Sequence, residues 1–309
     1  MKNKNLSISV DQLVKFFLRA IALTSSSIII VIVVFITARG IMPFISDNNS
    51  LGSVNVWRFL TGRTWLEGPT FVSNLYGAGY LVVNTLYVVF LSLLISFPIS
   101  VLSALFIAKI CPKQIAVVFR TIVELLASIP SIVFGLVGAG FILPIVYNLA
   151  DVLGERSVGG LGVISVAIVL ALMSIPTITT ISETAIRSVD PQLEDASFAL
   201  GATKVQTHAK ITLIAAKNGI FSGTILAIGR ALGEATAVSL VAGNATTGPS
   251  FSFFETTSTL TSMMLMGMHE TSGLDYDIRF SLGIVLLAVI LIVNFLLNLV
   301  KKKIGDLNE

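Results

Sequence analysis

The stretch Asp195–Gly201, which reads Asp-Ala-Ser-Phe-Ala-Leu-Gly, lies in the middle of the polar segment Glu183–Lys217 around which this chain is organised. The segment is rich in charged residues, whereas the long runs on either side of it are apolar enough to pass through lipid. It therefore belongs in water, between two membrane-spanning stretches.

The local chemistry of this segment predicts a helix, a tight stop and a second helix. Asp190 suits an N-cap and Pro191 the first helical position, where a missing N–H costs nothing. Gly201 can adopt the left-handed conformation that ends a helix, and helical spacing resumes from Thr203 to Leu213. A short amphipathic helix of this kind either lies on lipid headgroups or docks on a soluble partner, and the pattern alone allows both.

Composition identifies the class of protein. Hydrophobic residues make up 54% of the 309 residues and charged residues 12%, and the mean hydropathy is +0.92. A soluble globule of this composition would have too little polar surface to face water. Apolar runs of about 20 residues satisfy their backbone groups as helices, so we expect an all-α membrane protein with six transmembrane helices.

The apolar runs define the expected organisation. Five runs of about 20 or more residues are free of charges, and only the fifth span, at about 218–241, carries charges within its apolar run, Arg230 and Glu234. We expect a cytoplasmic N-terminus at 1–15, a first span at 16–42 and an external loop at 43–79. A core at 80–301 would follow, with five spans at about 80–108, 121–149, 158–182, 218–241 and 280–300. Within this core we expect a cytoplasmic loop at 183–217 and an external loop at 243–279, and after it a cytoplasmic C-terminus at 301–309.

Basic residues set the orientation. Lysine and arginine gather in the termini and in the loops on one side, including 183–217, whereas the opposite side has few. The positive-inside rule therefore predicts a multi-pass membrane protein with both termini and the 183–217 segment in the cytoplasm.

Arg230 and Glu234 are the sharpest chemical signal within the membrane. They lie four residues apart among small residues, which in a continuous helix places them on one face. One interpretation is a mutual ion pair that fixes packing, and the other is a pathway for an anion, to which Arg230 offers a two-pronged donor. Both interpretations stay open.

Prolines mark two other spans. Pro130 and Pro176 each interrupt an apolar run, and we expect them to kink helices and free backbone groups that can line a cavity. A kink needed only for packing is an equal alternative for Pro176.

Several functions are disfavoured by what the sequence lacks. There is no Gly-x-x-x-x-Gly-Lys-[Ser/Thr] loop for nucleotide phosphates, no paired cysteine motif and no Gly-x-Ser-x-Gly elbow. The two histidines, His208 and His269, fall on opposite sides of the membrane, and the single Cys111 cannot form an intrachain disulfide. We therefore expect a transport subunit with no catalytic residue, no metal site and no cofactor of its own.

The 195–213 pattern resembles the "EAA" loop of ABC importer permeases. The matching positions are an acidic residue, two small residues, a glycine and an Ile-x-Leu ending, here Asp195, Ala196, Ser197, Gly201, Ile211 and Leu213. The resemblance implies a type I ABC importer architecture in which these residues form the coupling helix that docks on the ATPase. Aspartate replaces the usual glutamate, and Ile214 replaces a proline. We therefore expect the second helix to continue into the membrane without a break.

Three further stretches narrow the resemblance to phosphate-specific permeases of bacterial ABC importers, PstC-type. They are Glu124–Ser131, Gly229–Glu234 with the following Val241–Asn244, and Phe59–Trp65 after the first span. The resemblance implies inward transport of phosphate across the bacterial plasma membrane by alternating access. Arg230 and Glu234 are our candidates for the substrate pathway. The resemblance also implies as partners a second permease (PstA-type), a dimer of an ATPase subunit that carries ATP and Mg²⁺ (PstB-type), and a phosphate-binding protein (PstS-type).

Three alternatives stay open. The chain could be the partner permease itself, or a permease for sulfate, molybdate or another oxyanion. It could also belong to a different class, a secondary transporter or a membrane scaffold without an ATPase. The aromatic residues Trp57 and Trp65 in the first external loop fit either an interfacial belt or a partner contact.

Overall fold

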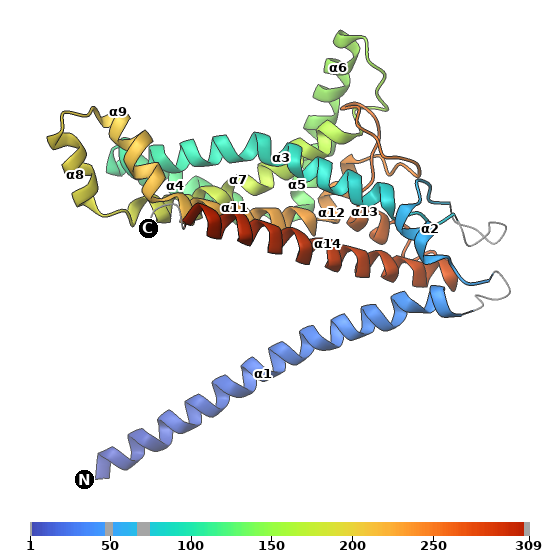
Figure 1. Ribbon diagram of the computed structural model, residues 1–309, viewed down its shortest axis with the longest axis horizontal. Coiled ribbons are helices and arrows are strands. Elements are labelled where there is room, and N and C mark those ends of the chain that lie inside the picture. Colours follow the sequence, from blue (N-terminus) through green and yellow to red (C-terminus); the bar gives the residue numbers. More distant parts are fainter. Residues whose placement is uncertain (1, 47–51, 67–74, 306–309) are drawn as a thin grey trace.

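The computed structural model describes residues 2–46, 52–66 and 75–305. Within these residues the secondary structure is helical, with isolated bridges but no strands, which confirms the expected all-α fold (Figure 1). The α-helices are α1 Lys2–Ile45, α2 Val56–Thr61, α3 Gly79–Leu105, α4 Lys113–Ser128, α5 Ser131–Val137, α6 Leu143–Leu153, α7 Val163–Arg187, α8 Pro191–Ala199, α9 Lys204–Thr207, α10 Leu213–Ala215, α11 Lys217–Leu232, α12 Thr236–Val241, α13 Leu260–Leu265 and α14 Leu274–Gly305. Three π-helical turns, Phe106–Ile110, Gly138–Ile142 and His208–Thr212, extend or join them.

Up to six helical stretches of the described chain are long and apolar enough to cross a membrane. Five are single runs: Gln12–Ile45, Gly79–Ile110, Ser131–Leu153, Val163–Arg187 and Leu274–Lys303. The sixth is the pair Lys204–Ala215 and Lys217–Leu232, whose two parts are bent by 65° relative to each other. The number of apolar helices therefore agrees with six spans.

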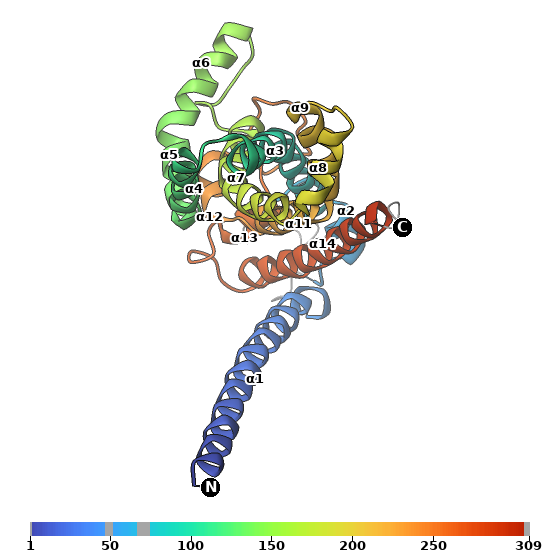
Figure 2. The ribbon, with the colours of Figure 1, turned by 90° about the vertical axis from the view of Figure 1, so that its left-hand side faces the viewer.

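Helix α7 lies at the centre of the bundle, with α3, α5 and α11 packed around it (Figure 2). Small side chains allow the closest of these contacts. On α3 the residues Ser92, Ser96, Ser100 and Ala104 recur every four positions and are fully buried. Small residues on one helix face let two backbones approach closely, which is the usual basis of helix association in membranes.

Helix α11 approaches α7 in the same way. A Cβ atom added at Gly219 would lie only 2.3 Å from the Cβ of Ala185, and one added at Gly223 would lie 2.9 Å from the Cβ of Ile181. The glycines at these two positions therefore fix the distance between α11 and α7, and through it the position of the residues farther along α11.

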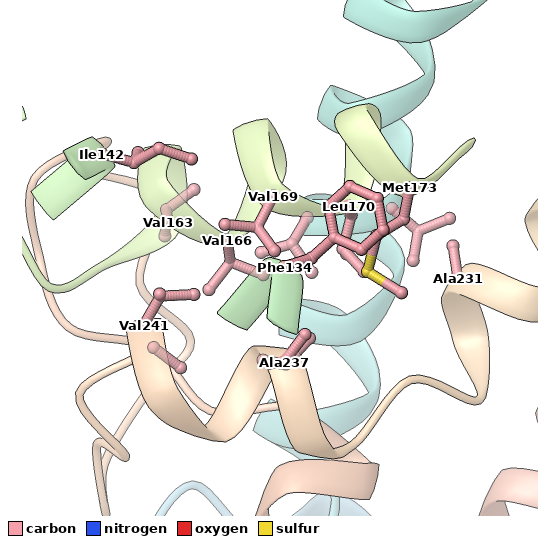
Figure 3. Close-up of a cluster of buried hydrophobic side chains, with 14 of the residues drawn as sticks. Phe134, Ile142, Val163, Val166, Val169, Leu170, Met173, Ala231, Ala237 and Val241 are labelled. Carbon is pink, nitrogen blue, oxygen red and sulfur yellow. The ribbon is translucent and has the colours of Figure 1, made fainter. Parts of the chain in front are cut away.

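The third and fifth expected spans are interrupted in the structure. Pro130 separates α4 from α5, so the stretch 121–149 is not one helix. The stretch 218–241 is likewise divided, because α11 ends at Leu232 and α12 begins at Thr236. Helices α5 and α12 pack together, and Phe134, Val169, Ala237 and Val241 belong to the apolar cluster drawn in Figure 3.

The two ends of the bundle differ. Helices α8 and α9 lie at one end, together with the C-terminus, whereas α2 and α13 lie at the other (Figure 1). Helix α1 extends from the α2 end, leans away from the bundle, and returns the N-terminus toward the side of α8 and α9. Its apolar side chains are largely exposed, for example Phe16 at 72%, as expected of a surface that lipid or another membrane subunit covers.

At the α2 end, a second apolar cluster joins the segment between α1 and α3 to α3, α13 and α14. Trp65 is 2% exposed and packs edge-to-face on Tyr76, so the interpretation of Trp65 as an interfacial-belt residue is wrong. Trp57 is 72% exposed and remains compatible with a belt or a partner contact. Residues 67–74, which complete this segment, lie outside the described residues.

Candidate functional site

A groove of about 690 Å³ runs between α7, α11 and α14. Its wall combines two cations with amide and hydroxyl side chains. The lining residues are Thr177, Ser222, Ile225, Leu226, Gly229, Arg230, Asn294, Asn298 and Lys301. No carboxylate lies among the described residues that line it, so the groove is positively charged and rich in hydrogen-bond donors.

Arg230 lies in the last turn of α11 and is exposed to the groove. It forms no ion pair with any described residue. A Cβ added at the neighbouring Gly229, which also lines the groove, would have no atom within 4 Å, so the groove is open at this position. An unpaired guanidinium in an open polar groove can receive an oxyanion through two parallel hydrogen bonds.

The opposite wall of the groove comes from α14. Asn294 and Asn298 lie four residues apart, hence on the same face of the helix, and Lys301 lies about one turn farther along it. These three residues were not among the candidates from the sequence. Their spacing was a usable signal, because two asparagines one turn apart in an apolar span mark one polar face.

Glu234 has a different role from the one that the sequence suggested. The expectation that Arg230 and Glu234 share one helix face is wrong, because α11 ends at Leu232. The Glu234 carboxylate accepts hydrogen bonds from Thr236 Oγ1 at 2.9 Å and from the backbone N–H of Ala237 at 3.1 Å. Thr261 Oγ1 also donates to the Glu234 carbonyl, at 2.7 Å, which ties this turn to α13.

The two prolines occupy different settings. Pro130 lies in the extended connection before α5, whereas α7 continues through Pro176. Near Pro176, Ser100 Oγ of α3 donates to the Ile175 carbonyl at 3.3 Å, and Thr180 Oγ1 donates to the Pro176 carbonyl at 2.9 Å. Hydroxyl groups thus satisfy backbone carbonyls around this proline.

The helix-stop-helix prediction for the polar segment is confirmed. Asp190 caps α8 by accepting a hydrogen bond from the Gln192 N–H at 2.9 Å. Gly201 has φ +84°, in the left-handed region, where only glycine is unstrained. Thr203 and Gln206 form a capping box that starts α9. We refer to residues 190–216 below as the coupling segment.

The face of the coupling segment turned toward the bundle is polar. Glu194 pairs with Lys109 at 2.8 Å and accepts a hydrogen bond from Thr212 Oγ1 at 2.7 Å. The hydroxyl groups of Ser197 and Thr207 are 2.9 Å apart and join α8 to the second helix. Burial raises the pKa of the Glu194 carboxyl, but the hydrogen bonds and the charge of Lys109 outweigh it, so the net pKa lies below its ordinary value.

The face turned away from the bundle exposes large apolar side chains beside charged ones. Leu200 is 90% exposed and Val205 is 78% exposed, while Asp195 and Ala196 are also at the surface. The exposed apolar side chains are available to a partner or to the headgroup region. Ser197, in contrast, is buried and braces the segment rather than facing outward.

The expectation that the second helix continues without a break is wrong. The 65° bend falls at Ala216, between α10 and α11, although Ile214 stands where a proline was expected. Ile211 and Leu213 are half-buried just before the bend, and Leu213 packs on the apolar cluster that includes Ile186 and Ile220. Helix α11 thus begins at a packed corner.

A second carboxylate links three helices at the same end of the bundle. Glu183 of α7 is 5% exposed and forms ion pairs with Arg120 of α4 and, at 2.8 Å, with Arg187 of α7. Arg187 Nη2 also donates to the Ile107 carbonyl at 3.0 Å, which connects the network to the end of α3. No sequence pattern predicts this network, because Arg120 and Glu183 are 63 residues apart.

Comparison with known proteins identifies the family. The family model described as "Binding-protein-dependent transport system inner membrane component" matches residues 97–306, well over half of the chain. The chain belongs to this family. The matched region includes the groove and the whole coupling segment.

Relatives in bacteria agree with the family. The chain is 32% identical over 277 residues to the "Probable ABC transporter permease protein YqgH" of Bacillus subtilis (strain 168), covering 89% of this chain and 85% of the relative. It is 31% identical over 252 residues to the "Phosphate transport system permease protein PstC" of Pasteurella multocida (strain Pm70), covering 76% and 78%.

Solved structures show the same fold. A chain of a bacterial alginate ABC transporter in complex with an alginate-bound periplasmic protein aligns with a TM-score of 0.62 at 20% identity, covering 94% of this chain and 95% of that one. A chain of the MetNI methionine ABC transporter aligns with a TM-score of 0.52 at 18% identity, covering 77% and 99%. The expected type I ABC importer permease architecture is thereby confirmed.

Membership in the family has direct consequences. The protein is a multi-pass inner-membrane permease subunit of an ABC importer, and it is not itself an enzyme. Such a permease works with an ATPase and with a substrate-binding protein, and it needs no cofactor of its own. The secondary-transporter and scaffold alternatives are therefore excluded.

Proposed function

We propose that this chain is a PstC-type permease subunit that imports inorganic phosphate. The observation that carries the proposal is the groove between α7, α11 and α14, which combines Arg230 and Lys301 with the amides of Asn294 and Asn298 and with no described carboxylate. Phosphate carries one to two negative charges at neutral pH, and a guanidinium matches two of its oxygens.

The composition of the groove suits passage rather than tight retention. Arg230 and Lys301 attract an anion, while neutral amides and hydroxyls exchange hydrogen bonds with it along the way. A wall of neutral donors lets phosphate leave one position for the next without crossing a deep energy minimum. Glu234 contributes indirectly, because its hydrogen bonds shape the turn that follows Arg230.

The similarity to the phosphate permease of Pasteurella multocida supports phosphate as the substrate. The Bacillus subtilis relative is named only as an ABC transporter permease, so its name does not specify a substrate. We propose as partners a second permease of the PstA type, a PstB-type ATPase dimer that binds ATP and Mg²⁺, and a PstS-type phosphate-binding protein. The groove, which is open along α11 and α14, would face the second permease.

The coupling residues follow from the two faces of the coupling segment. We propose that Asp195, Ala196 and the exposed Leu200 contact the ATPase, while Ser197, Gly201, Ile211 and Leu213 give the segment its shape. Closure of the ATPase dimer would then move α8 as a rigid piece and, through the bend at Ala216, reorient α11 with Arg230.

The proposed orientation places both termini and the coupling segment in the cytoplasm. The positive-inside distribution supports it, as does the arrangement of the bundle, in which α8, α9 and the C-terminus lie at one end and the N-terminus lies toward the same side (Figure 1). The α2 end, with α13 and the external loops, then faces the binding protein.

Energy-dependent uptake of radiolabelled phosphate tests the proposal, in cells that lack this chain and are complemented with it. Unlabelled arsenate, sulfate and molybdate serve as competitors. We expect the chain to restore uptake, and only arsenate to compete, because it shares the charge and tetrahedral geometry of phosphate. Restored uptake that sulfate or molybdate blocks would assign another oxyanion. Failure to restore uptake while the ATPase still co-purifies would refute the phosphate assignment but keep the importer architecture.

A further inference from the structure

A second cation-lined cavity, of about 440 Å³, lies near the coupling segment, where α3 and α7 end and α4 begins. Lys109, Lys113, Arg120 and Arg187 all line it. The cavity is separate from the transport groove, since the two share no lining residue.

The charges around this cavity do not balance. Glu194 pairs with Lys109, Glu183 is shared by Arg120 and Arg187, and Glu124 adds a weaker attraction to Arg120, so three carboxylates act on four cations. Lys113 forms no ion pair with any described residue and is exposed. Arg120 and Arg187 keep 44% and 42% of their side chains exposed, which leaves guanidinium N–H groups free to bind a further anion. The net positive field favours an anionic ligand.

Apolar side chains in and beside the cavity favour an anion attached to an apolar chain, although a small free anion would also fit. Val117 lines it, and the adjoining face of α4 exposes Val118, Phe119 and Ile122. Cations beside an exposed apolar helix face, at the end of membrane-spanning helices, are the usual setting of a phospholipid headgroup site. The first-turn N–H groups of α4 add a weaker attraction, because its N-cap Pro112 offers no side-chain cap.

We propose that this cavity binds a phosphate group at the cytoplasmic edge of the membrane, supplied by an anionic phospholipid headgroup or by free inorganic phosphate. Lys113 is the cation available solely for this ligand, and Arg120 and Arg187 contribute their free N–H groups. Arg120 and Arg187 also pair with Glu183, and Lys109, which lines the cavity too, pairs with Glu194 of the coupling segment. A phosphate group bound in the cavity would therefore stiffen the attachment of the coupling segment. The inference rests on the fold and its orientation, not on which substrate is transported.

The experiment measures the thermal unfolding midpoint of this chain in the complete purified transporter, in a neutral detergent. The additions are short-chain phosphatidylglycerol, short-chain phosphatidylcholine, and sodium phosphate matched in ionic strength with sodium chloride. The variants are Lys113→Gln, Lys113→Glu and Arg230→Gln. Lys302→Gln is the matched control, because Lys302 is an exposed lysine at the end of α14 outside both cavities.

We expect phosphatidylglycerol, but not phosphatidylcholine, to raise the midpoint of the wild type, of Lys302→Gln and of Arg230→Gln. Lys113→Gln is expected to need a roughly threefold to tenfold higher concentration, and Lys113→Glu to abolish the response. If sodium phosphate gives this pattern and phosphatidylglycerol does not, free phosphate is the ligand.

Two results would overturn the proposal. One is the absence of any midpoint shift with either phosphate source. The other is that every shift observed is insensitive to Lys113 or is removed by Arg230→Gln, since all responses would then come from elsewhere. Because Arg230→Gln is expected to keep this response, failure of the phosphate-import assignment would not be mistaken for failure of this site.

Discussion

The groove and the end of the bundle beside the coupling segment both gather cations, but they use them differently. We call this end the inner end, after the proposed orientation. At the inner end, Arg120, Arg187 and Lys109 are paired with Glu183 and Glu194, which tie α3, α4, α7 and the coupling segment together. In the groove, Arg230 pairs with no described carboxylate, and its neighbours are amides and hydroxyls.

The difference in pairing assigns the paired cations of the inner end to stability and the unpaired Arg230 of the groove to transport. A cation paired with a half-buried carboxylate stabilises one arrangement, because breaking the pair leaves a charge without its partner. A cation in a polar groove without a carboxylate can exchange one ligand for another. We therefore expect substitutions at the inner end to change assembly or coupling, and substitutions in the groove to change transport alone.

Gly201→Val is expected to have the largest effect at the inner end. No atom lies within 4 Å of a Cβ placed at Gly201, so the added side chain meets no neighbour, but valine at φ +84° is strained by about 1–2 kcal/mol. Relief of this strain would reshape the turn between α8 and α9. We expect uptake to fall to background while the protein stays in the membrane and ATP hydrolysis continues without transport.

The matched control is Gly154→Val, at φ +72° with no atom within 4 Å, after α6 and far from the coupling segment. It introduces the same kind of strain and is expected to leave coupling intact. Wild-type uptake by a well-expressed Gly201→Val protein would show that the turn does not couple the subunits.

Glu183→Gln is expected to have the next largest effect. It removes the charge that Arg120 and Arg187 share, with a cost on the order of 3 kcal/mol, reduced by the partial exposure of both arginines. A lower unfolding midpoint of the purified complex and a lower level of the protein in membranes would be measured. Glu155→Gln, at an exposed position after α6 that forms no ion pair with a described residue, is the control and should match the wild type. Equal midpoints for the two variants would mean that the network is not structural.

Glu194→Gln is expected to have the smallest effect, about 1–2 kcal/mol, confined to the coupling segment. Hydrogen exchange at α8 should speed up while α7 stays protected.

The ion pair between Glu194 and Lys109 also predicts how the coupling segment responds to pH. Because the pKa of Glu194 is lowered in the folded protein, the contribution of Glu194 to stability is complete above the unfolded-state pKa and is lost only as the pH falls through the lower folded value. The distance between spin labels on α8 and α4 should therefore stay constant from pH 8 to pH 6, and a change within that range would contradict the assignment of the pair.

Much of the fold follows from local patterns. Asp190, Pro191 and Gly201 act through their own backbone geometry, so the helix-stop-helix of the coupling segment could be predicted from sequence. Apolar length likewise predicts the spans. The break at Leu232–Thr236 was missed, because no proline marks it and Glu234 ends the helix through contacts with Thr236 and Ala237.

The candidate site depends on packing between distant segments. Arg230 stands out as a charge in an apolar run, but Asn294 and Asn298, which line the same groove, come from another helix, and the pairing of Arg120 with Glu183 crosses 63 residues. Such contacts are fixed by close helix approach, as at Gly219 against Ala185, which a single sequence does not reveal.

The most direct test of the account is ATP-driven phosphate uptake by Arg230→Gln in proteoliposomes that contain the complete transporter, measured together with co-purification of the ATPase and the unfolding midpoint. The account predicts an uptake at least about tenfold lower with an unchanged midpoint and an intact complex, because Arg230 has no structural partner among the described residues. Loss of the complex, or wild-type uptake, would contradict the claim that the groove beside Arg230 conducts phosphate.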